Sequence, residues 1–212
     1  MTTQSPAVEI LDWTPAWAER FTHDKAELAT VLPADATIEH VGSTSVPGLP
    51  AKPTIDILVT TNDVDALRIN LQPLEALGYY YNPKYFADDP DHLFLKRDTD
   101  GHRTEHPHIF HRRSPAPRSD RAFRDYLTAH PNAARRYSHA KKVAAKAHPD
   151  SRADYGQAKQ PVFQDLLEEA RAWAGIPPRP SDRIGPTRPG ETAPIWDRAR
   201  DQPPGENRQP ST

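Results

Sequence analysis

Apolar residues recur at helical spacing near the start of the chain, and β-branched residues take over afterwards. A first helix is indicated by four apolar residues that share one helical face, namely Trp17, Phe21, Leu28 and Val31. Thr14 suits the cap of this helix, and Pro15 suits its first position, where a missing amide hydrogen costs nothing. Residues 37–43 and 54–60 then have the pattern of strands, and the second is apolar enough to be central.

A second helix is predicted from about Asn62, with Gly78 placed to end it and Pro73 expected to kink or break it. Three short extended segments follow, at residues 79–81, 92–96 and 106–111. Together with the two earlier strands, they indicate a mixed sheet of about five strands.

The remaining elements are helical. Ser119 suits the cap of one helix, and Pro131 can open the next. A last helix carries apolar residues on one side, which are Tyr155, Val162, Leu166, Ala170 and Trp173. Strands first and helices afterwards predict an α+β domain, with a mixed sheet flanked by helices and a helical C-terminal part.

Composition adds boundaries to this picture. The chain has 212 residues, enough for one ordinary domain, which we place at residues 7–175 after a flexible N-terminus at 1–6. Nine prolines and few apolar residues follow in 176–212, so this segment is predicted to be a disordered tail.

Charge and cysteine content narrow the function. The 27 basic and 29 acidic residues nearly cancel, so nothing global favours nucleic acid or a membrane as a partner. The absence of cysteine excludes thiolate catalysis and cysteine-ligated metals. No segment has the pattern of a secretory signal or a membrane span, and we therefore expect a cytoplasmic protein.

The segment 38–59 carries the candidate chemistry. A strand runs into a Gly-Ser turn, and the following loop offers groups that suit phosphate oxygens, namely Gly42, Ser43, Thr44, Ser45 and Lys52. The next strand presents a single carboxylate, Asp56. Glu39 is expected to face the cleft as a polar partner of the loop. The segment suits an anion site, and it equally suits a capped surface loop with a solvated lysine.

The same segment resembles the signature of the GrpB-like proteins, which are grouped with the DNA polymerase beta type nucleotidyltransferases. The resemblance lies in Val-Gly-Ser-Thr-Ser-Val-Pro-Gly-Leu at 41–49, with Ala-Lys-Pro and Ile-Asp-Ile downstream. Further segments that look like the family are 11–17, 106–110, 122–127 and 155–159. The resemblance covers about residues 7–170 and implies a nucleotidyltransferase-like fold.

Membership implies roles for particular residues. Asp56 matches the first acid of an acid-x-acid pair that holds two divalent cations, Mg²⁺ or Mn²⁺, and it would be both catalytic and a metal ligand. The second acid is replaced by Leu58, which puts two-metal catalysis in doubt. Lys159 and Lys141 fall on C-terminal helices, where related folds place phosphate-binding cations, and Lys159 joins the predicted phosphate site.

Histidines offer one replacement for the missing acid. His106 and His108 have strand spacing, so their rings should share a face on which Asp56 also lies, and such a trio would bind manganese, iron or zinc better than magnesium. Alternatively, the two histidines hydrogen-bond within a polar cleft or bind phosphate.

Two classes of function remain from these observations. The first is a nucleotidyltransferase-like enzyme that binds a nucleotide triphosphate and a divalent metal and acts on an unknown acceptor. The second is a non-catalytic module for a nucleotide or another phosphorylated small molecule, or a scaffold recruited to another reaction such as adenylate-dependent ligation.

Overall fold

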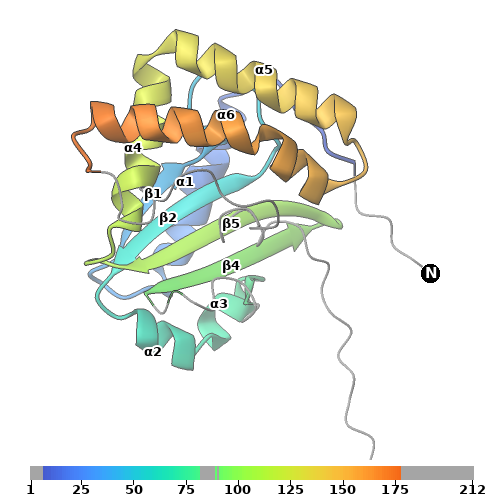
Figure 1. Ribbon diagram of the computed structural model, residues 1–212. Coiled ribbons are helices and arrows are strands. Elements are labelled where there is room, and N and C mark those ends of the chain that lie inside the picture. Colours follow the sequence, from blue (N-terminus) through green and yellow to red (C-terminus); the bar gives the residue numbers. More distant parts are fainter. Residues whose placement is uncertain (1–6, 82–88, 90, 178–212) are drawn as a thin grey trace, which may run out of the picture.

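The computed structural model describes residues 7–81, 89 and 91–177. The chain forms a five-stranded mixed sheet with helices on both faces (Figure 1), which confirms the predicted α+β class. The predicted flexible N-terminus at 1–6 lies outside the described residues, as does the predicted tail at 176–212 apart from its first two residues.

The sheet has the strand order β1-β2-β5-β4-β3. Its strands are β1 (Thr37–Val41), β2 (Ile55–Thr61), β3 (Tyr80–Tyr81), β4 (His92–Thr99) and β5 (His102–His111). The central pair, β2 and β5, is parallel, and the other neighbouring pairs are antiparallel. In this register Asp56 lies opposite Val41 on β1 and opposite His106 on β5. Strand order thus brings together residues that are far apart in the sequence.

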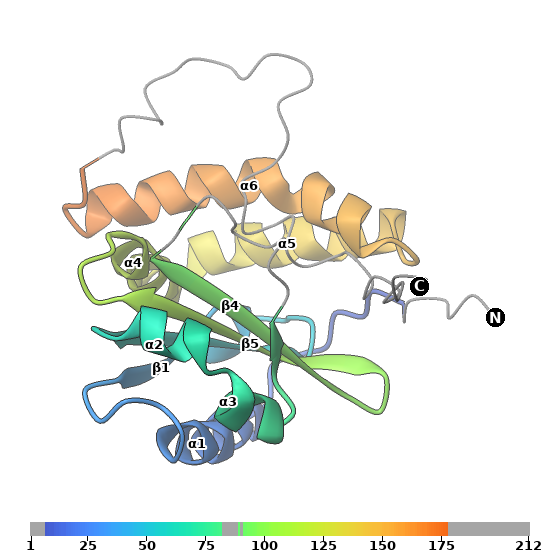
Figure 2. The same ribbon diagram turned by 90° about the horizontal axis from the view of Figure 1, so that it is seen from below.

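Two helical layers enclose the sheet, as Figure 2 shows edge-on. One layer contains α1 (Ala16–Ala29), α2 (Val64–Ile69) and α3 (Gln72–Ala76), and the other contains α4 (Ala116–Ala129), α5 (Pro131–Ala147) and α6 (Arg152–Trp173). Successive side chains of β2 point to opposite faces of the sheet, so the strand contributes to the packing of both helical layers. Ile57 belongs to the core with α1, whereas Leu58 packs with Val41 and Phe110 on the opposite face.

Local sequence signals explain most helix boundaries. Pro73 was expected to interrupt the helix after Asn62, and two short helices, α2 and α3, occupy this stretch. Gly78 follows α3 with φ of 84°, a left-handed conformation that glycine adopts at low cost.

The predicted start of α4 at Ser119 was wrong. The helix begins one turn earlier, at Ala116, after Pro115. Pro115 is the N-cap residue, and the hydroxyl of Ser114 before it accepts a hydrogen bond from the Ala116 amide at 3.4 Å. Ser119 instead accepts a hydrogen bond from the Arg171 guanidinium at 3.1 Å, which joins α4 to α6.

Within the described part of the chain, no helix combines the length and the apolar character that crossing a bilayer requires.

Candidate functional site

The Gly-Ser turn places the backbone directly against Asp56. Gly42 has φ of 73° and leads from β1 into a single 3₁₀ turn, Ser43–Ser45. A Cβ atom at Gly42 would lie 2.8 Å from both Cβ and Cγ of Asp56 and closer still to Oδ2. The Ser45 hydroxyl closes the turn by donating to the Gly42 carbonyl at 2.6 Å. Glycine is therefore required here for two reasons, backbone conformation and space for the carboxylate.

Thr44 fixes the loop from inside. Its hydroxyl donates to the Thr54 carbonyl at 3.2 Å and lies 3.0 Å from Nε2 of His40. Its own carbonyl accepts from the Trp13 indole at 3.1 Å. Because Thr44 is buried and held from three directions, the loop has its shape before any ligand arrives.

The expectation that Glu39 supports this loop was wrong. Alternation along β1 turns His40 toward α1, where its ring stacks on Phe21 at 4.8 Å and reaches Thr44. Glu39 instead accepts two hydrogen bonds from Arg121 on α4, at 2.6 and 2.8 Å. Burial lowers the pKa of His40 to about 4, so the imidazole is neutral at pH 7.

One narrow pocket brings most of the predicted site residues together. The predicted residues that line it are Ser43, Thr44, Lys52, Asp56, His106 and Lys159. Lys141 and Tyr137 from α5 and Tyr155 from α6 complete its wall. We call this the Asp56 pocket; its volume is about 30 Å³. Two other predicted residues, Gly42 and Ser45, shape the turn behind it without lining it.

Three ammonium groups converge on two tyrosine rings of this pocket. The Nζ atoms of Lys52 and Lys159 lie 5.0 and 5.9 Å from the centre of the Tyr155 ring. Nζ of Lys141 lies 4.7 Å from the Tyr137 ring. Such cation–π contacts orient an ammonium group without neutralising its charge. Three lysines therefore line the pocket beside a single carboxylate, Asp56.

Lys141 is the most deeply placed of the three. Its side chain is 2% exposed, and its Nζ donates a hydrogen bond to the Pro50 carbonyl at 2.5 Å. Burial lowers the pKa of Lys141 well below its usual range, the positive charge of Lys159 lowers it further, and Asp56 opposes the shift. A bound anion would stabilise the charged form of this lysine.

Lys141 was not among the predicted site residues, although its position on the apolar face of α5 is visible in the sequence. Lys141 follows Tyr137 by four residues, so both fall on the buried face of α5 with Ala133 and Ala144. A lysine on the apolar face of a helix needs a partner or a ligand, because an unpaired charge is costly to bury.

Asp56 and His106 meet, whereas His108 lies elsewhere. Nδ1 of His106 is 3.3 Å from Oδ1 of Asp56. The rings of His106 and His108 share a face of β5, but Nδ1 of His108 is 3.2 Å from Nε2 of His92, and its ring packs at 4.6 Å from Phe94. Burial lowers the pKa of His92 to about 3, so this histidine is neutral at pH 7. The predicted metal trio is therefore gathered only in part.

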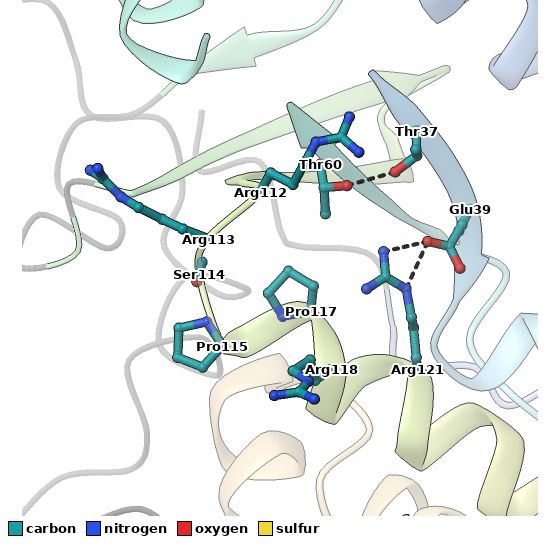
Figure 3. A pocket seen from close by; sticks show the side chains of 10 residues that line it. All are labelled: Thr37, Glu39, Thr60, Arg112, Arg113, Ser114, Pro115, Pro117, Arg118 and Arg121. Atoms are coloured by element: carbon teal, nitrogen blue, oxygen red, sulfur yellow. Dashed lines mark hydrogen bonds and ion pairs between the residues drawn. The ribbon is translucent and has the colours of Figure 1, made fainter. Parts of the chain in front are cut away.

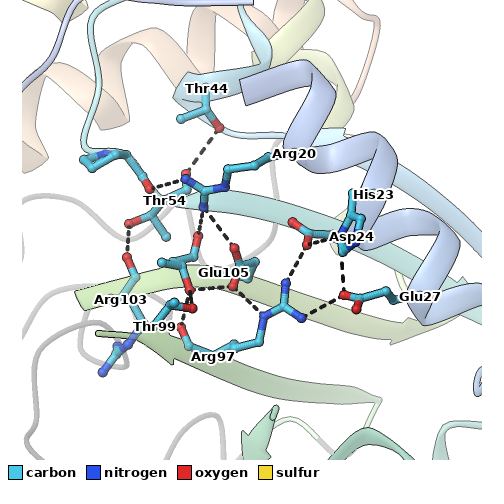
Figure 4. Close-up of polar contacts among 12 residues, drawn as sticks. Arg20, His23, Asp24, Glu27, Thr44, Thr54, Arg97, Thr99, Arg103 and Glu105 are labelled. Carbon is cyan, nitrogen blue, oxygen red and sulfur yellow. Dashed lines mark hydrogen bonds and ion pairs between the residues drawn. The ribbon is translucent and has the colours of Figure 1, made fainter. Parts of the chain in front are cut away.

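A different group of possible metal ligands, on α1, has a structural explanation. His23, Asp24 and Glu27 form the group of three that the described residues contain within ligand distance of one another. Figure 4 shows that Asp24 and Glu27 point at the Arg97 guanidinium, which also donates to Glu105 at 2.7 Å. We call Arg97 with its three carboxylates the Arg97 network. The carboxylates there already hold a cation of the protein, the Arg97 guanidinium.

Fold and site together define an α+β domain with a cationic pocket beside a Gly-Ser turn. The family model described as "GrpB protein" matches residues 7–169. The chain therefore belongs to the GrpB family, which confirms the resemblance seen in the sequence.

Relatives with known names agree with this assignment. The "UPF0157 protein YqkA" of Bacillus subtilis is 36% identical over 167 residues, which cover 78% of this chain and 48% of YqkA. A crystal structure of GrpB from Enterococcus faecalis matches with a TM-score of 0.68 at 31% identity, over 78% of this chain and 99% of that one. A dephospho-CoA kinase of Mycolicibacterium paratuberculosis is 31% identical over 164 residues, 65% of this chain and 39% of the kinase. The chain thus spans about half of YqkA and less of the kinase.

Proposed function

We propose that this protein binds the phosphate groups of a nucleotide, or of another phosphorylated small molecule, in the Asp56 pocket. The observation that carries the proposal is the surplus of positive charge among the described lining residues, where three lysines, Lys52, Lys141 and Lys159, face a single carboxylate. Ammonium groups form short, charge-assisted hydrogen bonds with phosphate oxygens. Ser43 adds the hydroxyl group of a turn that the buried Thr44 holds in a preformed shape.

The dimensions of the pocket support recognition of a phosphoryl group. A volume of about 30 Å³ has room for about two or three groups of the size of water or of a phosphate oxygen, so a nucleobase does not fit inside. The nucleoside or other organic part of the ligand would lie outside the pocket. We therefore expect the four ribonucleotide triphosphates to bind with similar affinity.

The residues of the pocket suit one divalent cation better than two. The position of the expected second acid, Leu58, is 0% exposed and packs against Val41 and Phe110. Two-metal chemistry therefore has no second carboxylate on β2. Asp56 and His106 could hold a single Mg²⁺ or Mn²⁺ if the phosphate oxygens of the ligand supplied further contacts, an arrangement common for Mg²⁺. Such a cation would neutralise phosphate charge beside the carboxylate.

Nucleotidyl transfer is the second candidate function. Asp56 occupies the position of the first acid in the nucleotidyltransferase pattern, and it lines the same pocket as the lysines. Transfer would release pyrophosphate once the acceptor is supplied. The similarity to a dephospho-CoA kinase favours coenzyme A precursors among the compounds to test.

The test is a calorimetric and thermal-shift panel of the four triphosphates and dephospho-coenzyme A, with and without Mg²⁺ or Mn²⁺. A ligand present at 100 times its Kd should stabilise the fold by about 2.7 kcal/mol. Lys159→Met should weaken every phosphate ligand by about tenfold or more, because a charge-assisted contact is lost. Lys142→Met is the matched control, since Lys142 is adjacent to Lys141 and its side chain is 55% exposed.

Asp56→Asn should change the affinity for phosphate in opposite directions with and without metal, and this difference tests the role of Asp56 as a metal ligand. Without metal, removal of the negative charge should tighten phosphate binding, because like charges repel. With metal, the same change should weaken binding, because a ligand of the cation is lost. The proposal would be wrong if no phosphate compound bound, or if Lys159→Met and Lys142→Met behaved alike.

Transfer activity needs a separate assay. Pyrophosphate release that depends on metal and disappears in Asp56→Asn would establish the enzyme. Leu58→Asp restores the acid-x-acid pair. New magnesium-dependent activity in that variant alone would indicate that the natural chain does not perform the two-metal reaction.

A further inference from the structure

A second basic site lies at the opposite end of β2 from Asp56. Four arginines, Arg112, Arg113, Arg118 and Arg121, line a groove with a volume of about 680 Å³ (Figure 3). We call it the arginine groove. Thr60 on its floor is four residues beyond Asp56, about 13 Å along the strand. The buried side chain of Leu58 lies between the two sites on this face, so the groove is separate from the Asp56 pocket.

The chain builds the groove from one short stretch around the start of α4. Arg112 and Arg113 follow β5 directly, and Arg118 and Arg121 lie on the first two turns of α4. Ser114 lies between the two pairs, and its hydroxyl accepts a hydrogen bond from the amide of Ala116, the first residue of the helix. The positive end of the helix dipole therefore adds to the charge of the guanidinium groups.

The arginines of the groove differ in whether they form ion pairs with carboxylates of the protein. Arg121 donates to Glu39, and Arg112 donates to the Asp35 carbonyl and lies 3.5 Å from its carboxylate. Within the described part of the chain, the Arg118 guanidinium forms no ion pair with a side chain, and it is exposed.

Arg113 is directed elsewhere. Figure 3 shows its side chain extending away from the other three, and its guanidinium is 3.1 Å from the Asp91 carboxylate. Exposed ion pairs of this kind contribute little stability, so a strong anionic ligand can replace them. We expect Arg118 to be the principal contact, with Arg112 and Arg121 assisting.

We propose that the arginine groove binds a small molecule that carries two or more phosphate groups, independently of the Asp56 pocket. Guanidinium groups match phosphate oxygens bidentately, and several of them here surround one groove of ligand size. Carboxylates of Asp35, Glu39 and Asp91 border the basic area and confine it. A compact polyanion fits this arrangement better than the extended backbone of a nucleic acid, which needs a continuous basic stripe.

The experiment is calorimetric titration of the whole chain with inorganic tripolyphosphate at about 50 mM salt, where screening is weak. Wild type should show two sites. Arg118→Ala should weaken one of them by about tenfold, and Arg112→Ala combined with Arg118→Ala should abolish it. Arg135→Ala, on an exposed position of α5, is the control and should match wild type. Circular dichroism and Tm verify that each variant is folded.

Lys159→Met identifies which site is which, because it removes a cation from the Asp56 pocket alone. If Lys159→Met leaves one site and the double arginine variant leaves the other, both proposals hold. If only the arginine variants affect binding, the groove proposal holds and the proposed function of the Asp56 pocket fails. If the double variant binds as wild type, or loses no more than Arg135→Ala, the groove proposal is overturned. Comparison of tripolyphosphate with ATP then shows whether the ligand is a free polyphosphate or a nucleotide.

Discussion

The molecule buries charged side chains in two regions, and the balance of charge differs between them. In the Arg97 network, one guanidinium reaches the carboxylates of Asp24, Glu27 and Glu105. In the Asp56 pocket, one carboxylate faces three lysines, Lys52, Lys141 and Lys159. In the first region Arg20 supplies a second guanidinium to Glu105 at 2.9 Å, so two cations face three carboxylates. The second lacks negative charge that a phosphorylated ligand would bring.

The pKa shifts of Asp24 and Lys141 reflect the difference in charge between the two regions. Burial raises the pKa of Asp24, Glu105 raises it further, and Arg97 and Arg20 act in the opposite direction. Burial lowers the pKa of Lys141, the neighbouring Lys159 lowers it further, and the Asp56 carboxylate opposes this. Both regions bear a desolvation cost, and in the network the carboxylates of Asp24 and Glu105 hold Arg97 in hydrogen-bond contact. A phosphate group bound in the Asp56 pocket should raise the pKa of Lys141, because a nearby negative charge stabilises the ammonium form.

The largest effect on stability is expected when the Arg97 network loses its central cation. Arg97→Met should reduce the free energy of unfolding by about 3–5 kcal/mol, because Asp24 is left buried without a guanidinium and Glu105 keeps only Arg20. Urea denaturation measures the change. Arg135→Met, on an exposed position of α5, should stay within about 0.5 kcal/mol of wild type. A loss below about 1 kcal/mol for Arg97→Met would contradict the structural role that we assign to the Arg97 network.

Gly42→Ala should have the next largest effect, and it acts on both stability and binding. The new methyl group meets the Asp56 side chain in a left-handed backbone conformation, so the turn or the carboxylate must shift. We expect a loss of about 1–3 kcal/mol and weaker phosphate binding.

Gly48 provides a matched control for this substitution within the same loop. Its φ is 76°, and a Cβ atom there has no neighbour within 4 Å. Gly48→Ala therefore shares the backbone cost and lacks the contact. Equal effects of the two substitutions on binding would show that the approach of the turn to Asp56 is not needed.

How far the sequence predicts this molecule depends on whether a feature is local. The break at Pro73 and the start of α5 at Pro131 follow from the chemistry of single residues, and both are observed. The start of α4 is missed because Ser119 suits a helix cap in sequence but lies inside the helix. There its hydroxyl accepts a hydrogen bond from Arg171 on α6, a contact across 52 positions.

The site follows the same rule. The loop with Gly42 and the acid Asp56 are recognisable from sequence because they lie within 15 residues of one another. Their meeting with His106 depends on the parallel pairing of β2 with β5, and strand order is not visible in periodicity. Lys141 is harder still, since its role arises only where the face of α5 closes over the loop at Pro50.

A smaller effect is expected from pH, through the imidazole that supports the loop. The pKa of His40 is about 4 in the folded protein, below the ordinary 6.5, so the unfolded chain binds more protons between these values. Stability from neutral His40 is present above pH 6.5 and falls as the pH drops toward 4. His40 alone should cost roughly 1–2 kcal/mol between pH 7.5 and pH 5. His40→Gln should flatten the curve of unfolding free energy against pH by this amount, whereas His139→Gln, exposed on α5, should leave it as in wild type.

Substitution of Lys141 should have the smallest effect on stability, although its effect on phosphate binding should be large. Lys141→Met removes a buried ammonium group whose charge the protein does not balance, and methionine has a similar length, so stability should stay within about 1 kcal/mol of wild type or rise. The hydrogen bond to the Pro50 carbonyl and the cation–π contact with the Tyr137 ring are lost on the protein side. Phosphate binding should weaken by about tenfold or more, as measured by calorimetry beside the Lys142→Met control. A stability loss as large as that of Arg97→Met would instead mean that Lys141 has a structural role. A lysine whose role is to bind a ligand should not be needed for folding when the ligand is absent.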